Sequence, residues 1–181
     1  RQFKVHLNID DVPEEQLINF AKNIGYFQGL SVLAINFSEP SNLSPQVLDI
    51  LGISLLGLKG LEELQISLQQ EKESVLSKFM NIFRSQKREP DSFHRLFSYI
   101  SRMESLRNLS ICIKECDIFG RTSIAEMRKE LRLLTKLEKF DFRFEKFFKI
   151  TYSEIEPLLL ELRHLRNLDW LYIWIVTFYR K

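Results

Sequence analysis

A short apolar pattern recurs along the chain and limits the folds that the chain can adopt. In LRNLSICIKEC, residues 106–116, one leucine stands three positions ahead of alternating apolar residues at 109, 111 and 113. The same arrangement returns at residues 30–37, 61–68, 137–144 and 165–172, and in part at residues 5–9. Alternation of apolar and polar residues is typical of a half-buried strand. The sequence therefore predicts six strands that share one template.

The strands recur at nearly constant spacing. Aligned on the second apolar position, the repeats fall at Val5, Leu33, Leu64, Leu109, Phe140 and Leu168. The spacings are 28, 31, 45, 31 and 28 residues, so four of the five lie within three residues of each other. The long spacing indicates an insertion, which we place at residues 70–91.

The insertion has apolar residues on one helical face and basic residues on the rest. One interpretation is an extra helix that packs on the outside of the array. The other is a helix that binds a partner, because insertions in repeat proteins often lie on a binding face. A helix on a membrane surface is less consistent with its short length and with Glu71 and Glu73.

A stretch with helical periodicity follows each of the first five strands. The five stretches are residues 12–24, 44–56, 91–103, 122–134 and 151–165. Ser44 is the expected cap of the second helix, and Thr122 or Ser123 that of the fourth. Pro157 is expected in the first turn of the last helix, where its missing N–H costs little.

Neither element can bury its single apolar face alone, but stacked strand–helix units share one core. The expected fold is α/β, with a parallel sheet on one side and helices on the other. Because helices are wider than strands, the stack should curve into a horseshoe segment with the sheet on its concave face. We expect residues 1–181 to form one domain of about six repeats within a longer chain.

The pattern Leu-x-x-Leu-x-Leu, followed by a turn and a helix, resembles the leucine-rich repeat proteins over essentially the whole chain. Repeats near 28 residues are similar to the ribonuclease-inhibitor-like class, and the extended alternation resembles degenerate repeats of large protist proteins. The usual asparagine or cysteine after the strand is mostly absent, although Cys116 stands at that position. The resemblance implies a leucine-rich repeat solenoid that serves as an adaptor, an assembly component, or a cytoskeletal or ciliary part.

Composition limits the partners and the compartment. The 26 basic and 24 acidic residues leave a net charge of +2, which argues against a nucleic-acid protein with its basic stripe. Two cysteines, Cys112 and Cys116, are too few for a disulfide framework, so we expect a reducing, cytoplasmic location. The longest apolar run, residues 170–178, is too short to span a membrane.

No motif in the sequence predicts catalysis, a cofactor, a metal or a small-molecule substrate. His6, His94 and His164 belong to different repeats, and the C-x3-C pair has no second pair to complete a tetrahedral metal site. The stretch GISLLGLKG, residues 52–60, follows a helix and lacks the Ser or Thr that a phosphate loop needs after its lysine. The sequence therefore favours a protein that is not an enzyme.

The residues between the apolar strand positions should line the concave face. The first four repeats offer small neutral groups there, the fifth a charged pair, and the sixth turns apolar, with Ile173 and Ile175 continuing that side. The candidate partner-binding residues of the concave face are Asn8, Asn36, Gln65, Ser67, Ser110, Asp141, Arg143, Asp169 and Leu171. Alternatively, Asp141 and Arg143 only satisfy each other.

The last strand forms a second candidate surface. This strand, with Trp170, Tyr172, Trp174, Val176 and Phe178, is apolar on both sides, and an uncovered end would expose that surface together with a free strand edge. Further repeats or another subunit should cover it. We therefore expect a scaffold that binds protein within a larger assembly. The alternative is the substrate-recognition arm of a ubiquitin ligase or of a GTPase-regulator complex, and nucleic-acid binding is least favoured.

Overall fold

The computed structural model describes residues 3–9, 12–38, 43–69, 92–114, 116, 118–147 and 151–177. Within them, strands and helices alternate along the chain. In order they are β1 (Phe3–Ile9), α1 (Glu14–Ile24), β2 (Leu30–Phe37), α2 (Pro45–Gly57), β3 (Glu63–Gln69), α4 (Phe93–Ile100), β4 (Asn108–Lys114), α5 (Arg121–Leu131), β5 (Lys139–Phe147), α6 (Tyr152–Glu161), the short 3-10 helix η2 (Leu162–His164) and β6 (Trp170–Thr177). The predicted insertion at residues 70–91 lies outside the described residues.

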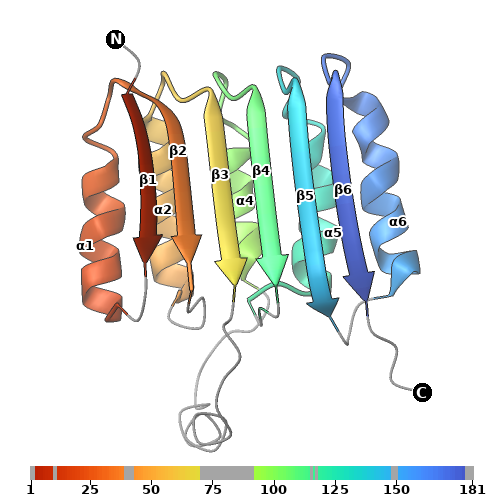
Figure 1. Ribbon diagram of the computed structural model, residues 1–181, viewed down its shortest axis with the longest axis horizontal. Helices are drawn as coiled ribbons and strands as arrows, with labels where there is room; N and C mark the ends of the chain where they lie inside the picture. Colours follow the sequence, from red (N-terminus) through yellow and green to blue (C-terminus); the bar gives the residue numbers. More distant parts are fainter. Residues whose placement is uncertain are drawn as a thin grey trace, which may run out of the picture.

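The six strands form one sheet in chain order, and each is parallel to its neighbours. Parallel neighbours need a crossover connection, and each described crossover contains a helix. The described helices lie behind one face of the sheet (Figure 1), and we call the other face the open face. The prediction of an α/β chain with a parallel sheet is confirmed, and the sheet is open rather than closed into a barrel.

The sheet contributes three apolar rows to the core, and they cross the sheet on its helix side. The register aligns Leu33, Leu64, Leu109 and Phe140 in one row, Ile35, Ile66, Ile111 and Phe142 in the next, and Phe37, Leu68, Ile113 and Phe144 in the third. Each of these side chains is at most 2% exposed. Full burial of such a side chain stabilises the fold by roughly 1.5–3 kcal/mol. The rows therefore supply much of the stability.

The leading leucine of each repeat closes the turn that enters the strand. Leu61 and Leu137 are fully buried. The backbone N–H of Leu61 donates to the carbonyl of Leu58 at 3.1 Å, and that of Leu137 donates to Leu134 at 3.0 Å. A residue three positions before the strand pattern can therefore enter the core while the chain is still turning. This explains the gap of three in the sequence pattern.

The helices bury the faces that their periodicity predicted. Of the two predicted helix caps, one is confirmed. Ser44 caps α2 by accepting from the backbone N–H of Val47 at 3.3 Å. The cap expected for α5 is wrong, because the helix begins after Gly120. Ser123 is buried, and its Oγ accepts from the backbone N–H of His94 in α4 at 3.2 Å. Pro157 lies in the second turn of α6 and not in the first.

Polar side chains connect each helix to the next one along the array. The pairs are Glu14 with Ser44, Asp49 with Arg95, Ser101 with Glu130, Arg121 with Glu154, and Arg128 with Glu161. Most of these groups are partly exposed, and exposed ion pairs contribute about 0–1 kcal/mol each. They align neighbouring helices more than they stabilise them.

The pairing of the last strand differs from the predicted alignment. Phe140 pairs with Leu171 and not with Leu168, so the last spacing is 31 residues. Leucines at 162, 165, 168 and 171 are all three apart, and this periodicity permits two alignments. Leu168 occupies the turn position of a leading leucine, because its N–H donates to the carbonyl of Leu165 at 3.1 Å.

This shift exchanges the two faces of β6, because three is an odd number and alternate residues point to opposite faces. Ile173 and Ile175 pack against the core. Tyr172 pairs with Asp141 and Trp174 with Arg143, on the open face. The predicted concave-face positions of Asp169, Leu171, Ile173 and Ile175 are therefore wrong. Asp169 precedes the strand, and Leu171 belongs to an apolar row.

Both ends of the sheet leave part of the core uncovered by described residues. Val5, Leu7 and Ile9 on β1 are only partly buried, and Leu171 on β6 is 47% exposed. No helix in the described part of the chain is both long and apolar enough to cross a membrane.

The central rows should dominate stability. Ile111→Ala should lower the free energy of unfolding by about 2–5 kcal/mol, because it removes a fully buried side chain from the middle of the core. Leu133→Ala, at a half-exposed position, should change it by less than about 0.5 kcal/mol. Urea unfolding followed by circular dichroism measures both. Equal effects would contradict the assigned core.

The register of β6 makes a separate prediction. Ile173→Ser should destabilise the chain more than Trp174→Ser, by about 1 kcal/mol, although tryptophan is the larger side chain. The reason is that Ile173 packs against the core while Trp174 lies on the open face. Chemical denaturation measures the stability of both variants. A larger destabilisation by Trp174→Ser would instead support the pairing of Leu168 with Phe140.

Candidate functional site

The open face is the face of the sheet that none of the described helices covers. Parallel sheets usually have both faces buried, so a bare face is unusual. The register arranges its side chains in rows, and three of these rows cross all six strands. They are Lys4, Val32, Glu63, Asn108, Lys139 and Trp170; His6, Ala34, Gln65, Ser110, Asp141 and Tyr172; and Asn8, Asn36, Ser67, Cys112, Arg143 and Trp174.

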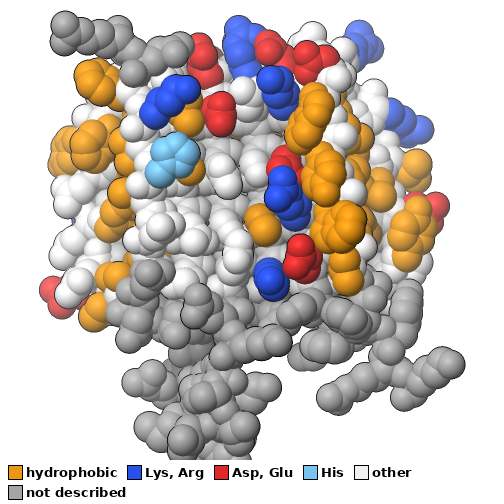
Figure 2. All heavy atoms as spheres, viewed as in Figure 1, with side chains coloured by type: hydrophobic (Ala, Val, Ile, Leu, Met, Phe, Trp, Pro, Cys, Tyr) orange, Lys and Arg blue, Asp and Glu red, His pale blue; other side chains and the backbone are white. Residues whose placement is uncertain are grey.

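Small polar side chains occupy the middle of this face, as the sequence predicted. Asn36 Nδ2 donates to Asn8 Oδ1 at 3.5 Å. Gln69 Nε2 donates to Ser67 Oγ at 2.8 Å and approaches Cys112 Sγ at 3.9 Å. Figure 2 shows this neutral region between the histidine on one side and a column of hydrophobic side chains on the other. The strand register thus brings together Asn8, Asn36, Gln65, Ser67 and Ser110.

A hollow of about 410 Å³ lies over β3, β4 and β5. Gln65, Ser67, Ser110 and Cys112 are among its lining residues, and so are the charged side chains of Glu63, Lys139, Asp141 and Arg143 and the ring of Trp170. A second hollow, of about 230 Å³, is lined mainly by residues of the turns before the strands, including Leu58, Met103 and Lys136. Only the first hollow gathers the predicted binding residues.

Asp141 and Arg143 form a pair within this hollow. Arg143 donates from Nε to Asp141 Oδ1 at 3.0 Å and from Nη2 to Oδ2 at 2.9 Å, and Ser110 Oγ donates to Oδ2 at 3.3 Å. These bonds raise the pKa of Arg143, so its guanidinium stays charged. The Asp141 side chain is 12% exposed and that of Arg143 is 48% exposed. The pair therefore presents its positive member to solvent.

Three aromatic side chains follow one another on the open face of β6. We call Trp170, Tyr172 and Trp174 the aromatic column; they are 46%, 38% and 48% exposed. The rings of Trp170 and Tyr172 are stacked with centroids 6.1 Å apart and an interplanar angle of 15°. The guanidinium carbon of Arg143 lies 5.1 Å from the centroid of the Tyr172 ring. This contact joins the charged pair to the column.

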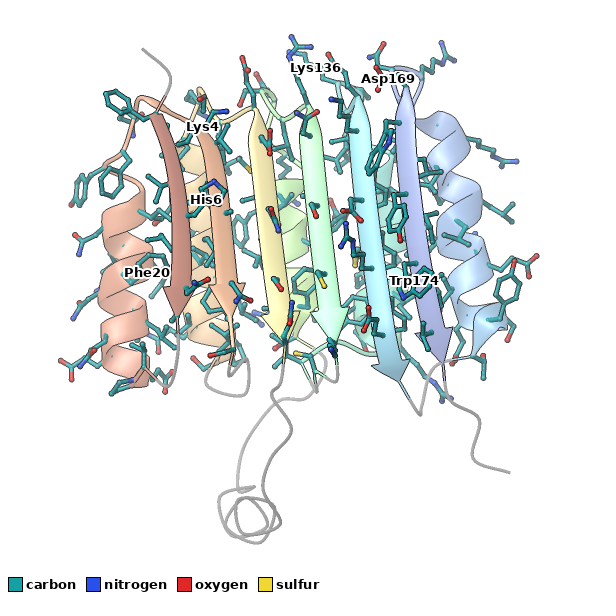
Figure 3. The ribbon with its side chains drawn as sticks, in the orientation of Figure 1. Lys4, His6, Phe20, Lys136, Asp169 and Trp174 are labelled. Atoms are coloured by element: carbon teal, nitrogen blue, oxygen red, sulfur yellow. The ribbon has the colours of Figure 1, made fainter. Side chains whose placement is uncertain are left out.

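The sequence identified these three aromatic residues but placed them on a separate end surface. In the structure Trp170 lines the hollow together with the predicted polar residues, and Tyr172 and Trp174 pair in register with its lining residues Asp141 and Arg143. His6 and Trp174 lie toward opposite ends of the open face (Figure 3). Aligning Leu171 instead of Leu168 makes the last spacing 31 residues, equal to two of the other spacings, and this was the signal that would have placed the column correctly.

Two predicted residues do not join this site. The backbone N–H of Asp169 donates to the carbonyl of Glu138 at 2.9 Å in the turn before β6. Leu171 lies in the apolar row of Phe140.

The described residues contain no group of three or more His, Cys, Asp or Glu side chains arranged to hold a metal. Cys112 is half-buried on the open face, and Cys116 is buried in the turn after β4.

The Cys112 thiol offers a direct probe of the hollow. Burial raises its pKa, although a hydrogen bond with Ser67 acts in the opposite direction. Alkylation requires the thiolate, and a raised pKa reduces the thiolate fraction at any given pH. At pH 8 iodoacetamide should therefore react more slowly with the Cys112 thiol than with the thiol of glutathione. The rate of Cys112 labelling should increase steeply at higher pH. Peptide mass spectrometry measures this rate, Cys112→Ser is the control, and labelling as fast as glutathione would contradict the burial.

The chain was also compared with protein-family models, curated proteins and solved structures. No family model, curated protein or solved structure matches it.

Proposed function

We propose that this chain is a leucine-rich repeat scaffold that binds a protein partner through the open face of its sheet and catalyses no reaction. The observation that carries the proposal is the position of the aromatic column and Arg143 on a bare sheet face beside a polar hollow. Side chains on such a face are available to a partner without any rearrangement of the core.

The repeat itself supports the leucine-rich repeat part of the proposal. A leading leucine precedes each of β3, β4, β5 and β6, three residues before the first apolar row. Each of these leucines is buried or partly buried. The described helices lie on one side of the sheet (Figure 1). In such arrays the wider helices force a curve with the sheet inside, and we propose that curvature for this chain.

The composition of the site supports protein binding. Tryptophan, tyrosine and arginine are the residues most enriched among those that contribute most to protein interfaces. Here they adjoin one another, and Arg143 is already held by Asp141 and Tyr172. A partner would therefore immobilise few side chains on docking, which reduces the entropic cost of binding.

Site-specific photo-crosslinking in an extract of the native source tests the proposal. A photoreactive phenylalanine analogue replaces Tyr172 in the column in one sample and Ile53 in another. Ile53 lies on α2 and is also well exposed. We expect a discrete protein adduct from the first position and none from the second, because only the first lies on the open face.

A matched pair of alanine variants gives the control. Trp174→Ala in the crosslinking protein should reduce the adduct, whereas Leu160→Ala, an exposed apolar position on α6, should leave it unchanged. Equal adducts from Tyr172 and Ile53, or an adduct only from Ile53, would show that the open face is not the binding surface.

A further inference from the structure

We propose that the hollow beside the aromatic column binds an extended acidic segment of the partner, with apolar side chains at alternate positions. This inference rests on the proposed function and specifies the partner's chemistry. It does not depend on what pairs with the free edge of β6, because the column projects from the face of the sheet and not from its edge.

The spacing of the column fits an extended chain. Its residues occur at every second position of one strand, and the Trp170 and Tyr172 rings are 6.1 Å apart. Side chains on one face of an extended segment repeat about every 6.4–6.8 Å. Successive same-side residues of a segment that runs along β6 can therefore each contact one ring. Its other face then lies toward β5, whose side chains adjoin the column in register.

The charges around the hollow favour carboxylates. Both oxygens of Asp141 accept hydrogen bonds from Arg143 or Ser110, and Glu63 accepts from Asn108 at 3.4 Å. The exposed charges beside the column are cationic: Arg143 pairs in register with Trp174, and Lys139 pairs with Trp170. Among the described residues, Lys139 has no ion-pair partner.

These two cations lie four residues apart on β5, which corresponds to roughly 13 Å along a strand. Carboxylates at corresponding spacing on an extended segment would meet both of them. The hydrogen bonds of Arg143 to Asp141 use Nε and Nη2, so Nη1 can donate to such a carboxylate.

An acidic peptide fits this surface better than a nucleic acid does. Aromatic rings beside cations can also stack bases, but a phosphate backbone needs cations along its whole path. Here carboxylates interrupt the cations, with Glu63 at one side of the hollow and Glu145 paired to Lys114 at 3.9 Å. Isolated carboxylates on a peptide match two separated cations without meeting these acidic groups.

Intrinsic fluorescence can test the inference, because the chain contains two tryptophans and both belong to the column. The probe is an acetylated, amidated heptapeptide of alternating Glu and Leu, which has no fluorescence of its own. Titration into residues 1–181 should give a saturable change in tryptophan emission. The same peptide with Lys in place of Glu should bind at least about tenfold more weakly, because it meets the cations with like charge.

A matched pair of variants locates the contact. Lys139→Gln should weaken binding of the acidic peptide about threefold, the scale of one exposed ion pair. Lys4→Gln should leave binding unchanged, since Lys4 lies in the same row at the other end of the sheet. Circular dichroism confirms that both variants fold.

The inference would be overturned by no saturable change with the acidic peptide, by equal binding of the lysine peptide, or by tighter binding of a single-stranded oligouridine. An equal loss of affinity in Lys139→Gln and Lys4→Gln would overturn it as well. The crosslinking experiment is independent of these peptides. A Tyr172 adduct without acidic-peptide binding would therefore refute the inference and leave the proposed function standing.

Discussion

The structure depends on the lateral packing of equivalent apolar residues from one repeat against the next. Ile35, Ile66, Ile111 and Phe142 lie side by side in one row, and each is almost completely buried by its neighbours and by the helices behind it. A single strand–helix unit has only one apolar face on each element and cannot bury it alone. Each repeat therefore completes the core of the repeats beside it. The parallel direction of the strands follows from the helical crossover within each unit.

The same packing determines which side chains reach the open face. Alternate residues of a strand point to opposite faces, so a strand that places one residue in the core must present the next to solvent. The pairing of Phe142 with Ile173 and of Phe144 with Ile175 consequently sets Tyr172 and Trp174 beside Asp141 and Arg143. Core register thus positions the candidate site without any residue of the site having to direct the fold.

Burial also determines which member of the charged pair faces solvent. Asp141 sits low on the sheet, where the Arg143 guanidinium and the Ser110 hydroxyl satisfy its oxygens. Arg143 extends over the Tyr172 ring and remains half-exposed. A pair that is neutral in sum therefore presents a cation to an approaching molecule. Because this cation is held by a carboxylate and by an aromatic ring, it is more ordered than an isolated surface arginine.

The amino-acid sequence determined the repeat, the order of strands and helices, and the core rows wherever alternation allowed a single alignment. Residues 61–68 and 106–113 show this, because only one of their faces is apolar. Tertiary structure decided the register of β6, where leucines at 162, 165, 168 and 171 permit two alignments and both faces are apolar. It also assigned Ser123 to a contact with α4 instead of a cap. Local pattern cannot resolve such cases, because the choice depends on hydrogen bonds and burial supplied by a neighbouring repeat. The aromatic column therefore became part of the open face only through the pairing of β6 with β5.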